Sequence, residues 1–211
     1  MIALIDYNMG NLQSVVNAFQ LLREDMRVTQ NPEDVRKADA IVLPGVGAFG
    51  DGMKNLDKLG LIPVLQEEVR ERKKPFLGIC LGMQLAAREG TEHGIHQGLG
   101  WLDGRVERIE PGPSSYKIPH MGWNNLFVKK DTGLFSGIED AVYYFVHSYS
   151  FCPAPGEEES VAATCWHGKE VVAAVEKENI FGVQFHPEKS QGAGLKLLEN
   201  FLSAVFPMAY A

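Results

Sequence analysis

The sequence predicts a three-layer α/β fold, with helices on both faces of a mainly parallel open sheet and added antiparallel strands in the second half. In the first half, short apolar runs alternate with amphipathic segments, the order that builds parallel sheets through right-handed crossovers. From about Gly98, strand-like runs follow one another with turn residues between them. At 211 residues, we expect a single domain spanning 1–211.

The first half is predicted to contain three strands and two helices. In order, they are a strand at 1–6, a helix at 11–23, a strand at 38–45, a helix at 55–74 and a strand at 75–79. In the first helix, apolar residues from Leu12 to Leu22 recur at helical spacing and form one buried stripe. The second helix is charged, and we expect it to break near Pro63.

The second half is predicted to be mainly strands, followed by one helix. The strand-like runs are 100–110, 124–128, 141–151, 161–167 and 170–186. The last run is interpreted as a hairpin that turns near Glu178 and Asn179. In the final helix, Leu195, Leu198 and Leu202 share one side, and Ser190 is a candidate N-cap.

Composition excludes several classes of protein. A hydrophobic content of 45% and a charged content of 22% are typical of soluble globular proteins. The net charge of −7 argues against nucleic-acid binding, and no apolar run is long enough for a membrane span. The N-terminus lacks the basic start of a signal peptide. The three cysteines show no paired spacing, so we expect a reducing, cytoplasmic location.

The segment GICLG places Cys80 between Gly78 and Gly82, where a strand leads into a helix. This is the G-x-nucleophile-x-G pattern, in which larger side chains would collide at the sharp turn. The turn would lift the sulfur above the carboxyl edge of the sheet, and the helix N-terminus would favour a thiolate. The alternative is a buried structural cysteine beside two packing glycines.

His186 is the best candidate for the base that a thiol nucleophile needs. It ends an apolar run, Pro187 stops the strand, and Glu188 follows closely enough to hold the imidazole. Taken alone, Glu188 would be interpreted as a carboxylate at a helix N-terminus. In addition, Pro44–Gly47 (PGVG) follows a strand and could supply backbone N–H groups to an oxyanion. The same loop could bind phosphate or simply turn the chain, although it lacks the P-loop ending.

Together, PGVGAF, GICLGMQ and GVQFHPEKS, in this order, resemble the class I (triad) glutamine amidotransferases over essentially the whole chain. Finer motifs, among them DYNMGNLQSV, IPHMGWN and HSYSF, resemble one branch of that family, the glutaminase subunits of imidazole glycerol phosphate synthases. Met83 stands where the anthranilate synthase branch has histidine, and Val46 differs from other branches too. One position departs from the pattern, because Asn8 occupies the place of an expected glycine.

The resemblance implies a chemistry for these residues. The Cys80 thiolate would attack the side-chain amide of glutamine, His186 would move protons, and Glu188 would orient His186. The N–H groups of Leu81 and Val46 would bind the oxyanion, the second after its peptide turns. Substrate contacts carry over as Gly47, Gln84, Glu92, Ser148 and Tyr149. Two of these have plainer alternatives, since Gln84 could be a solvated helix residue and Glu92 an ordinary surface carboxylate.

The resemblance also implies a heterodimer and no cofactor or metal. The partner would be a (β/α)8-barrel cyclase, which reacts the ammonia with phosphoribulosyl-formimino-aminoimidazole carboxamide ribotide, yielding imidazole glycerol phosphate and aminoimidazole carboxamide ribotide in histidine biosynthesis. Candidate interface residues are Asn11, Trp123 and Lys189, although Trp123 could instead belong to the core. Three alternatives remain: the glutaminase subunit of another amidotransferase, a stand-alone γ-glutamyl cysteine hydrolase, and a non-catalytic binding module.

Overall fold

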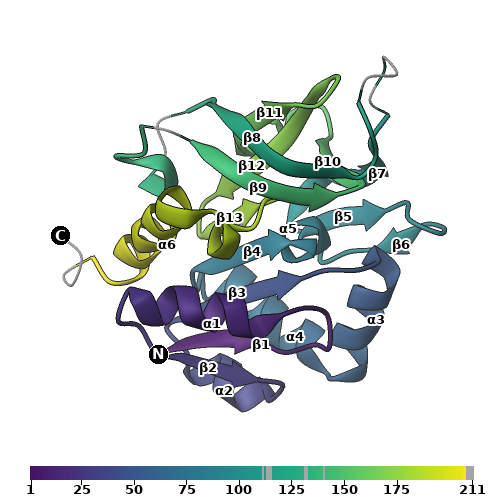
Figure 1. Ribbon diagram of the computed structural model, residues 1–211. Helices are drawn as coiled ribbons and strands as arrows, with labels where there is room; N and C mark the ends of the chain where they lie inside the picture. The colour runs from purple at the N-terminus through teal and green to yellow at the C-terminus, as the bar shows by residue number, and fades with distance from the viewer. Residues whose placement is uncertain (111, 113–115, 131–132, 140, 208–211) are drawn as a thin grey trace.

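A computed structural model describes residues 1–110, 112, 116–130, 133–139 and 141–207 (Figure 1). Within these ranges, a nine-stranded sheet has the order β2-β1-β3-β4-β13-β12-β11-β8-β9. Its first five strands are parallel: β2 (Met26–Thr29), β1 (Ile2–Ile5), β3 (Ala40–Gly45), β4 (Phe76–Cys80) and β13 (Ile180–Val183). The other four are antiparallel: β12 (Glu170–Lys177), β11 (Val161–Trp166), β8 (His120–Val128) and β9 (Val142–His147).

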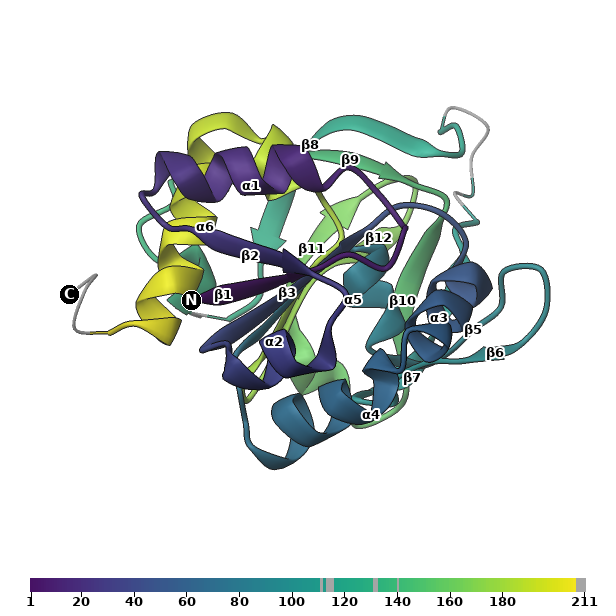
Figure 2. The ribbon, with the colours of Figure 1, turned by 90° about the horizontal axis from the view of Figure 1, so that it is seen from below.

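Helices cover both faces of this sheet (Figure 2). One face carries α1 (Leu12–Leu21) and α6 (Gln191–Val205), and the other carries α2 (Pro32–Lys37), α3 (Phe49–Lys58), α4 (Leu61–Leu65) and the π-helical turn η1 (Gln66–Glu71). Alternate residues of β1 belong to separate buried clusters, because successive side chains of a strand point to opposite faces. The predicted fold class is therefore confirmed.

A second, smaller sheet has the order β10-β7-β5-β6 within the described residues. Its strands are β10 (Tyr149–Pro153), β7 (Leu102–Arg108), β5 (Ala87–Gly90) and β6 (His96–Gln97). The run 141–151, expected as one strand, is therefore two: β9 belongs to the large sheet and β10 to the small one, with Ser148 between them. The switch of sheets at Ser148 brings this corner to the carboxyl edge of the large sheet, beside Cys80.

The helix expected at 55–74 differs from the structure. Helix α3 already begins at Phe49, and the interruption lies at Gly60, which adopts a left-handed φ of 65°. Pro63 does not break the chain, because it lies in the first turn of α4, where a proline costs no helical hydrogen bond. The hairpin predicted at Glu178 and Asn179 is confirmed between β12 and β13.

The final helix is confirmed, with Leu198 and Leu202 fully buried and Leu195 packed at the edge of the same cluster. Ser190 precedes the helix as expected, but its side chain makes no capping bond. Instead, its hydroxyl donates to His186 O at 2.6 Å and accepts from the Tyr144 N–H at 3.0 Å. Ser190 thus fastens the segment after His186 to β9.

Helix α5 (Leu81–Leu85) and three single-turn 3-10 helices complete the described elements. The 3-10 helices are η2 (Gly133–Phe135), η3 (Glu158–Ser160) and η4 (Pro187–Lys189). Among the helices of the described ranges, none combines the length and the apolar character needed to cross a bilayer.

Candidate active site

Cys80 ends β4 and immediately precedes α5 (Leu81–Leu85), on a sharply bent backbone. Its φ of 54° and ψ of −107° lie outside the regions that residues with a side chain normally adopt, so the corner stores strain. The two flanking glycines make the bend possible. A Cβ on Gly78 would lie 2.7 Å from the backbone of Gly82, and one on Gly82 would lie 1.7 Å from Leu43 O. The structure therefore has the elbow geometry that the motif predicts.

His186 and Glu188 follow β13, which is hydrogen-bonded in parallel to β4. This pairing brings residues from distant parts of the chain to the carboxyl edge that carries Cys80. Glu188 Oε1 lies 2.7 Å from His186 Nδ1, and both side chains are 4% exposed. With Nδ1 bound to Glu188, the other ring nitrogen, Nε2, is free for chemistry. Among the described residues, Nε2 has no hydrogen-bond partner.

The electrostatics favour a protonated imidazole at His186. Burial works to lower the pKa of His186, but its interactions with Cys80 and Glu188 outweigh burial and raise that pKa to about 9. Because Nδ1 is bound to Glu188, Nε2 is the ring nitrogen that remains available to Cys80. Burial raises the pKa of Cys165 to about 12 and also raises that of Cys152. Neither of these thiols is prepared to act as a nucleophile at neutral pH.

A cavity of about 300 Å³ opens above the sulfur. It brings together all of the residues that the sequence predicts for the oxyanion and the substrate: Val46, Gly47, Leu81, Gln84, Glu92, Ser148 and Tyr149. They lie in the segments that follow β3, β4, β5 and β9 in the chain, so only the folded sheet makes them neighbours. The volume suits a ligand the size of an amino acid.

The two predicted oxyanion donors differ in this structure. Leu81 is the first residue of α5, where a helix provides no internal acceptor for the N–H group. The Val46 N–H, in contrast, donates to Met9 O at 3.2 Å, in the loop after β1. Asn8 in that loop has a φ of 61°, a left-handed conformation that asparagine tolerates, so the departure from glycine preserves the turn.

Gln84 and Glu92 are both held by the protein. Gln84 is 6% exposed, and its Nε2 donates to Tyr149 O at 3.0 Å and to Gln184 Oε1 at 2.9 Å. The interpretation of Gln84 as a solvated helix residue is therefore wrong. Glu92 is half-buried, and its Oε2 accepts from the Phe49 N–H at 3.0 Å at the start of α3, so it is not an ordinary surface carboxylate.

Two residues near the sulfur were not anticipated from the sequence. Gln184 is fully buried, and its Nε2 lies 3.6 Å from Cys80 Sγ. A polar residue inside the apolar run before His186 was the available signal. Tyr7 is also buried, with its hydroxyl against Gly45, and burial together with the charge of Cys80 raises its pKa well above the ordinary value.

The three candidate interface residues lie at the same edge of the molecule as the site. Trp123 is 49% exposed, so its interpretation as a core residue is wrong, and it packs edge-on against Tyr144. Lys189 Nζ lies 6.0 Å from the centre of the same Tyr144 ring. Asn11 caps α1 by accepting from the Gln13 N–H. A cavity of about 80 Å³ is lined by Asn11 and Lys189 as well as by His186 and Glu188.

Comparisons with known proteins agree with this geometry. Residues 3–205 match the family described as glutamine amidotransferase class-I, which confirms the family predicted from the motifs. The chain is 50% identical to "Imidazole glycerol phosphate synthase subunit HisH" of Zymomonas mobilis, covering 95% of this chain and 94% of that protein. It is also 50% identical to "Imidazole glycerol phosphate synthase subunit HisH 1" of Campylobacter jejuni, covering 96% and 99%.

Solved structures show the same fold at lower identity. A crystal structure of a glutamine amidotransferase matches with a TM-score of 0.76 and 20% identity, covering 97% of this chain and 99% of that one. A glutamine amidotransferase from Thermotoga maritima matches with a TM-score of 0.68 and 18% identity, covering 97% and 96%.

Proposed function

The chain belongs to the glutamine amidotransferase class-I family, and from that membership we propose that it is the glutaminase subunit of an imidazole glycerol phosphate synthase in histidine biosynthesis. The observation that carries the proposal is the arrangement of Cys80, His186 and Glu188 at one edge of the sheet, below a cavity of about 300 Å³. Relatives of 50% identity that carry this subunit's name support the choice of branch.

The proposed reaction begins with attack of the Cys80 thiolate on the side-chain carbonyl carbon of glutamine. The carbonyl electron pair moves to oxygen, and the resulting oxyanion is held by the Leu81 N–H. As the C–N bond breaks, imidazolium at His186 gives its proton to the leaving nitrogen, which departs as ammonia. His186 then takes a proton from the water that attacks the γ-glutamyl thioester. The C–S bond then breaks, its electron pair returns to the Cys80 sulfur as thiolate, and glutamate leaves with His186 again protonated.

The bond between the Val46 N–H and Met9 O supports a site that is incomplete in the isolated subunit. For the Val46 N–H to reach the oxyanion, its peptide must turn and this bond must be given up. One such donor typically contributes about 3 kcal/mol to transition-state stabilisation. We therefore expect the isolated chain to hydrolyse glutamine slowly, and the partner to raise the rate by favouring the turned peptide.

We further propose a (β/α)8-barrel cyclase as that partner, docked over Asn11, Trp123 and Lys189. The cavity of about 80 Å³ supports this position, because it extends from His186 and Glu188 to Asn11 and Lys189. Ammonia passed in this direction would reach the barrel without meeting bulk water, where it would be protonated and lost. The three free thiols are consistent with a reducing cytoplasm, where we place the enzyme as a single domain of residues 1–211.

The decisive experiment uses Cys80→Ala in the complex reconstituted with the cyclase. We expect glutamine-dependent formation of imidazole glycerol phosphate to fall by at least about a thousandfold, while synthesis from added ammonium salt stays at the wild-type rate. Loss of both activities would make Cys80 a structural residue. Fast constitutive glutamine hydrolysis by the chain alone would favour a stand-alone hydrolase instead.

The interface is tested by Trp123→Ala. A truncated interface aromatic commonly costs more than 1 kcal/mol of binding, so we expect the affinity for the cyclase, measured by calorimetric titration, to fall at least about tenfold. Val28→Ala serves as a control, because Val28 is similarly exposed, at 43%, but belongs to β2, at the opposite end of the nine-stranded sheet from β8 and β9. Unchanged affinity in Trp123→Ala would remove that residue from the proposed interface.

A further inference from the structure

A continuous line of polar groups runs through the interior and ends at the sulfur of Cys80. It begins on β8, crosses β9 to the corner between β9 and β10, and continues through α5 to the segment after β13. The hydrogen bonds join, in order, Asn124, His120, His147, Tyr149 O, Gln84, Gln184 and Cys80 Sγ.

Hydrogen-bond chemistry determines the direction of this line. The carbonyl of Tyr149 can only accept, so the amide of Gln84 must present its NH2 group to it, at 3.0 Å. The same NH2 group faces Gln184, which must therefore present its oxygen, at 2.9 Å. The NH2 group of Gln184 is then left to face Cys80 Sγ, at 3.6 Å.

The histidine half of the line has its own direction, and it ends at the same Tyr149 carbonyl. His147 Nδ1 lies 2.8 Å from Tyr149 O and must donate to it. Burial lowers the pKa of His147 to about 4 and that of His120 to about 3, so both rings are neutral at pH 7. His147 Nε2 then accepts from His120 Nδ1, and His120 Nε2 accepts from the amide of Asn124. Each histidine therefore donates from Nδ1 and accepts at Nε2, and every hydrogen bond in this half has one donor and one acceptor.

We propose that Gln184 is a positioning residue that stabilises the Cys80 thiolate and directs it toward the cavity by donating an N–H to the sulfur. An N–H donor stabilises a thiolate more than a thiol, because the charged form is the stronger acceptor. Gln184 cannot turn its oxygen to the sulfur without losing its bond with Gln84. The inference rests on the proposed function, in that it assumes that Cys80 is the nucleophile.

Several titratable groups face this sulfur from other elements. His186, with Glu188 bound behind it, lies after β13, Tyr7 lies after β1, and Glu92 and His147 line the same cavity as Cys80. All of these are retained when Gln184 alone is changed. A difference between the wild type and a Gln184 variant therefore reports the N–H donor.

The test measures alkylation of Cys80 by iodoacetamide in the whole chain, without glutamine or partner. Mass spectrometry follows the Cys80 peptide from about pH 5 to about pH 10, since the thiolate is the reacting form. In Gln184→Met, which has a similar length and no N–H donor, we expect the midpoint of the profile to move up by about one pH unit. Below the midpoint, this shift corresponds to a rate about tenfold lower.

Two further variants keep the experiment decisive. Gln84→Met removes the hydrogen bond that holds the Gln184 amide. Because that amide is then free to turn, we expect a smaller shift in the same direction. Gln97→Met, at an exposed glutamine of β6, is the matched control and should leave the profile unchanged. If Gln184→Met fails to fold, Gln184→Asn, whose amide is one methylene shorter, takes its place.

The outcomes separate this inference from the proposed function. An unmoved profile in a folded Gln184 variant, with Cys80 still reacting faster than Cys152, overturns the role of Gln184 alone. If Cys80 in the wild type reacts no faster than Cys152, the proposed nucleophile is wrong and the inference fails with it. A shift in Gln184→Met but not in Gln97→Met supports the proposal.

Discussion

The two ends of β4 each hold a buried glutamate next to a basic side chain, yet the two pairs are suited to different tasks. Before the strand, Glu68 Oε2 lies 2.7 Å from Lys74 Nζ, and the glutamate side chain is 1% exposed. Beyond its carboxyl end, Glu188 Oε1 lies 2.7 Å from His186 Nδ1, and the glutamate side chain is 4% exposed. Distance and burial alone therefore do not distinguish them.

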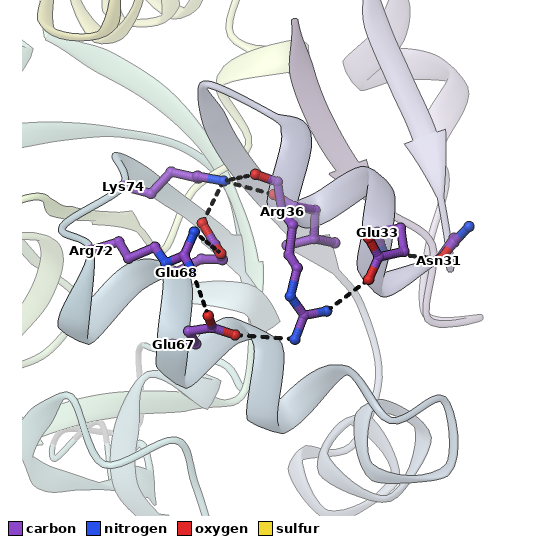
Figure 3. A network of polar contacts seen from close by, with 8 residues as sticks. Asn31, Glu33, Arg36, Glu67, Glu68, Arg72 and Lys74 are labelled. Carbon is purple, nitrogen blue, oxygen red and sulfur yellow. Dashed lines mark hydrogen bonds and ion pairs between the residues drawn. The ribbon is translucent and has the colours of Figure 1, made fainter.

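At the amino end, the pair belongs to a network that joins separate elements (Figure 3). Lys74 Nζ also donates to the carbonyls of Val35 and Arg36 at 2.8 Å, at the end of α2. Arg72 lies 2.7 Å from Glu67 and 3.5 Å from Glu68. The network fastens α2 and η1 to the start of β4, and an ammonium group with three donors and no lone pair is suited to that task.

At the carboxyl end, the basic partner has a second functional atom. Glu188 is hydrogen-bonded to Nδ1 of His186, and Nε2 remains available to Cys80. An imidazole nitrogen can donate or accept a proton, whereas an ammonium can only donate. The comparison teaches that a buried ion pair becomes a candidate for chemistry when its cation can release a proton toward a reacting atom.

Among changes to these two pairs, removing the charge of Glu188 should have the largest effect on activity. In Glu188→Gln, the amide no longer stabilises imidazolium and can hold the wrong tautomer of His186. We expect glutamine-dependent kcat of the complex to fall by about a hundredfold to a thousandfold. The ammonium-dependent rate is the internal control, and a loss of less than about threefold would contradict the role of Glu188.

The matched change at the other end, Glu68→Gln, should reverse the pattern. It leaves the buried Lys74, whose side chain is 10% exposed, without its closest countercharge. Breaking a buried pair costs about 3 kcal/mol, which should appear as a lower free energy of unfolding in urea, with kcat unchanged. A large loss of activity in a folded Glu68→Gln protein would show that the two ends are not independent.

The pH dependence of stability should depend on His186 and not on Glu68. His186 has a folded-state pKa raised from 6.5 to about 9. Its proton therefore stabilises the fold fully below pH 6.5, and this contribution is lost as the pH rises through about 9. A shift from 6.5 to about 9 corresponds to about 3 kcal/mol, which we expect to disappear over this window in the wild type and in Glu68→Gln, but not in His186→Asn. Urea unfolding across the window measures it, and equal slopes in all three would refute the assignment.

The smallest expected effect concerns backbone strain at Cys80. Glycine normally destabilises a structured position relative to alanine. At a φ of 54° and a ψ of −107° the order should reverse, so we expect Cys80→Gly to be more stable than Cys80→Ala by about 1 kcal/mol. Both variants lack the sulfur, so their difference in thermal unfolding isolates the strain. Alanine as the more stable residue would show that the corner is relaxed.

Much of the fold and the site could be predicted from local patterns. Residues that are close in the sequence determine the apolar runs of β1, β3 and β4 and the buried stripe of α1. The same is true of the hairpin at Glu178. The helix break at Gly60 was harder to predict, because Pro63 is the stronger local signal for a break. A glycine ends a helix only where it adopts a left-handed conformation, which the sequence does not show. The split at Ser148 could not be predicted, since sheet membership depends on distant partners.

Cys80, His186 and Glu188 were identifiable because each lies in a motif whose glycines, proline and spacing have a local steric reason. Their meeting, however, depends on β13 pairing with β4, a contact between residues about a hundred positions apart. The same holds for Gln184, whose bond to the sulfur is a consequence of tertiary packing. Local steric constraints depend on consecutive residues, so the sequence alone determines them. The direction of a buried hydrogen bond depends on all of its neighbours, so only the tertiary structure determines it.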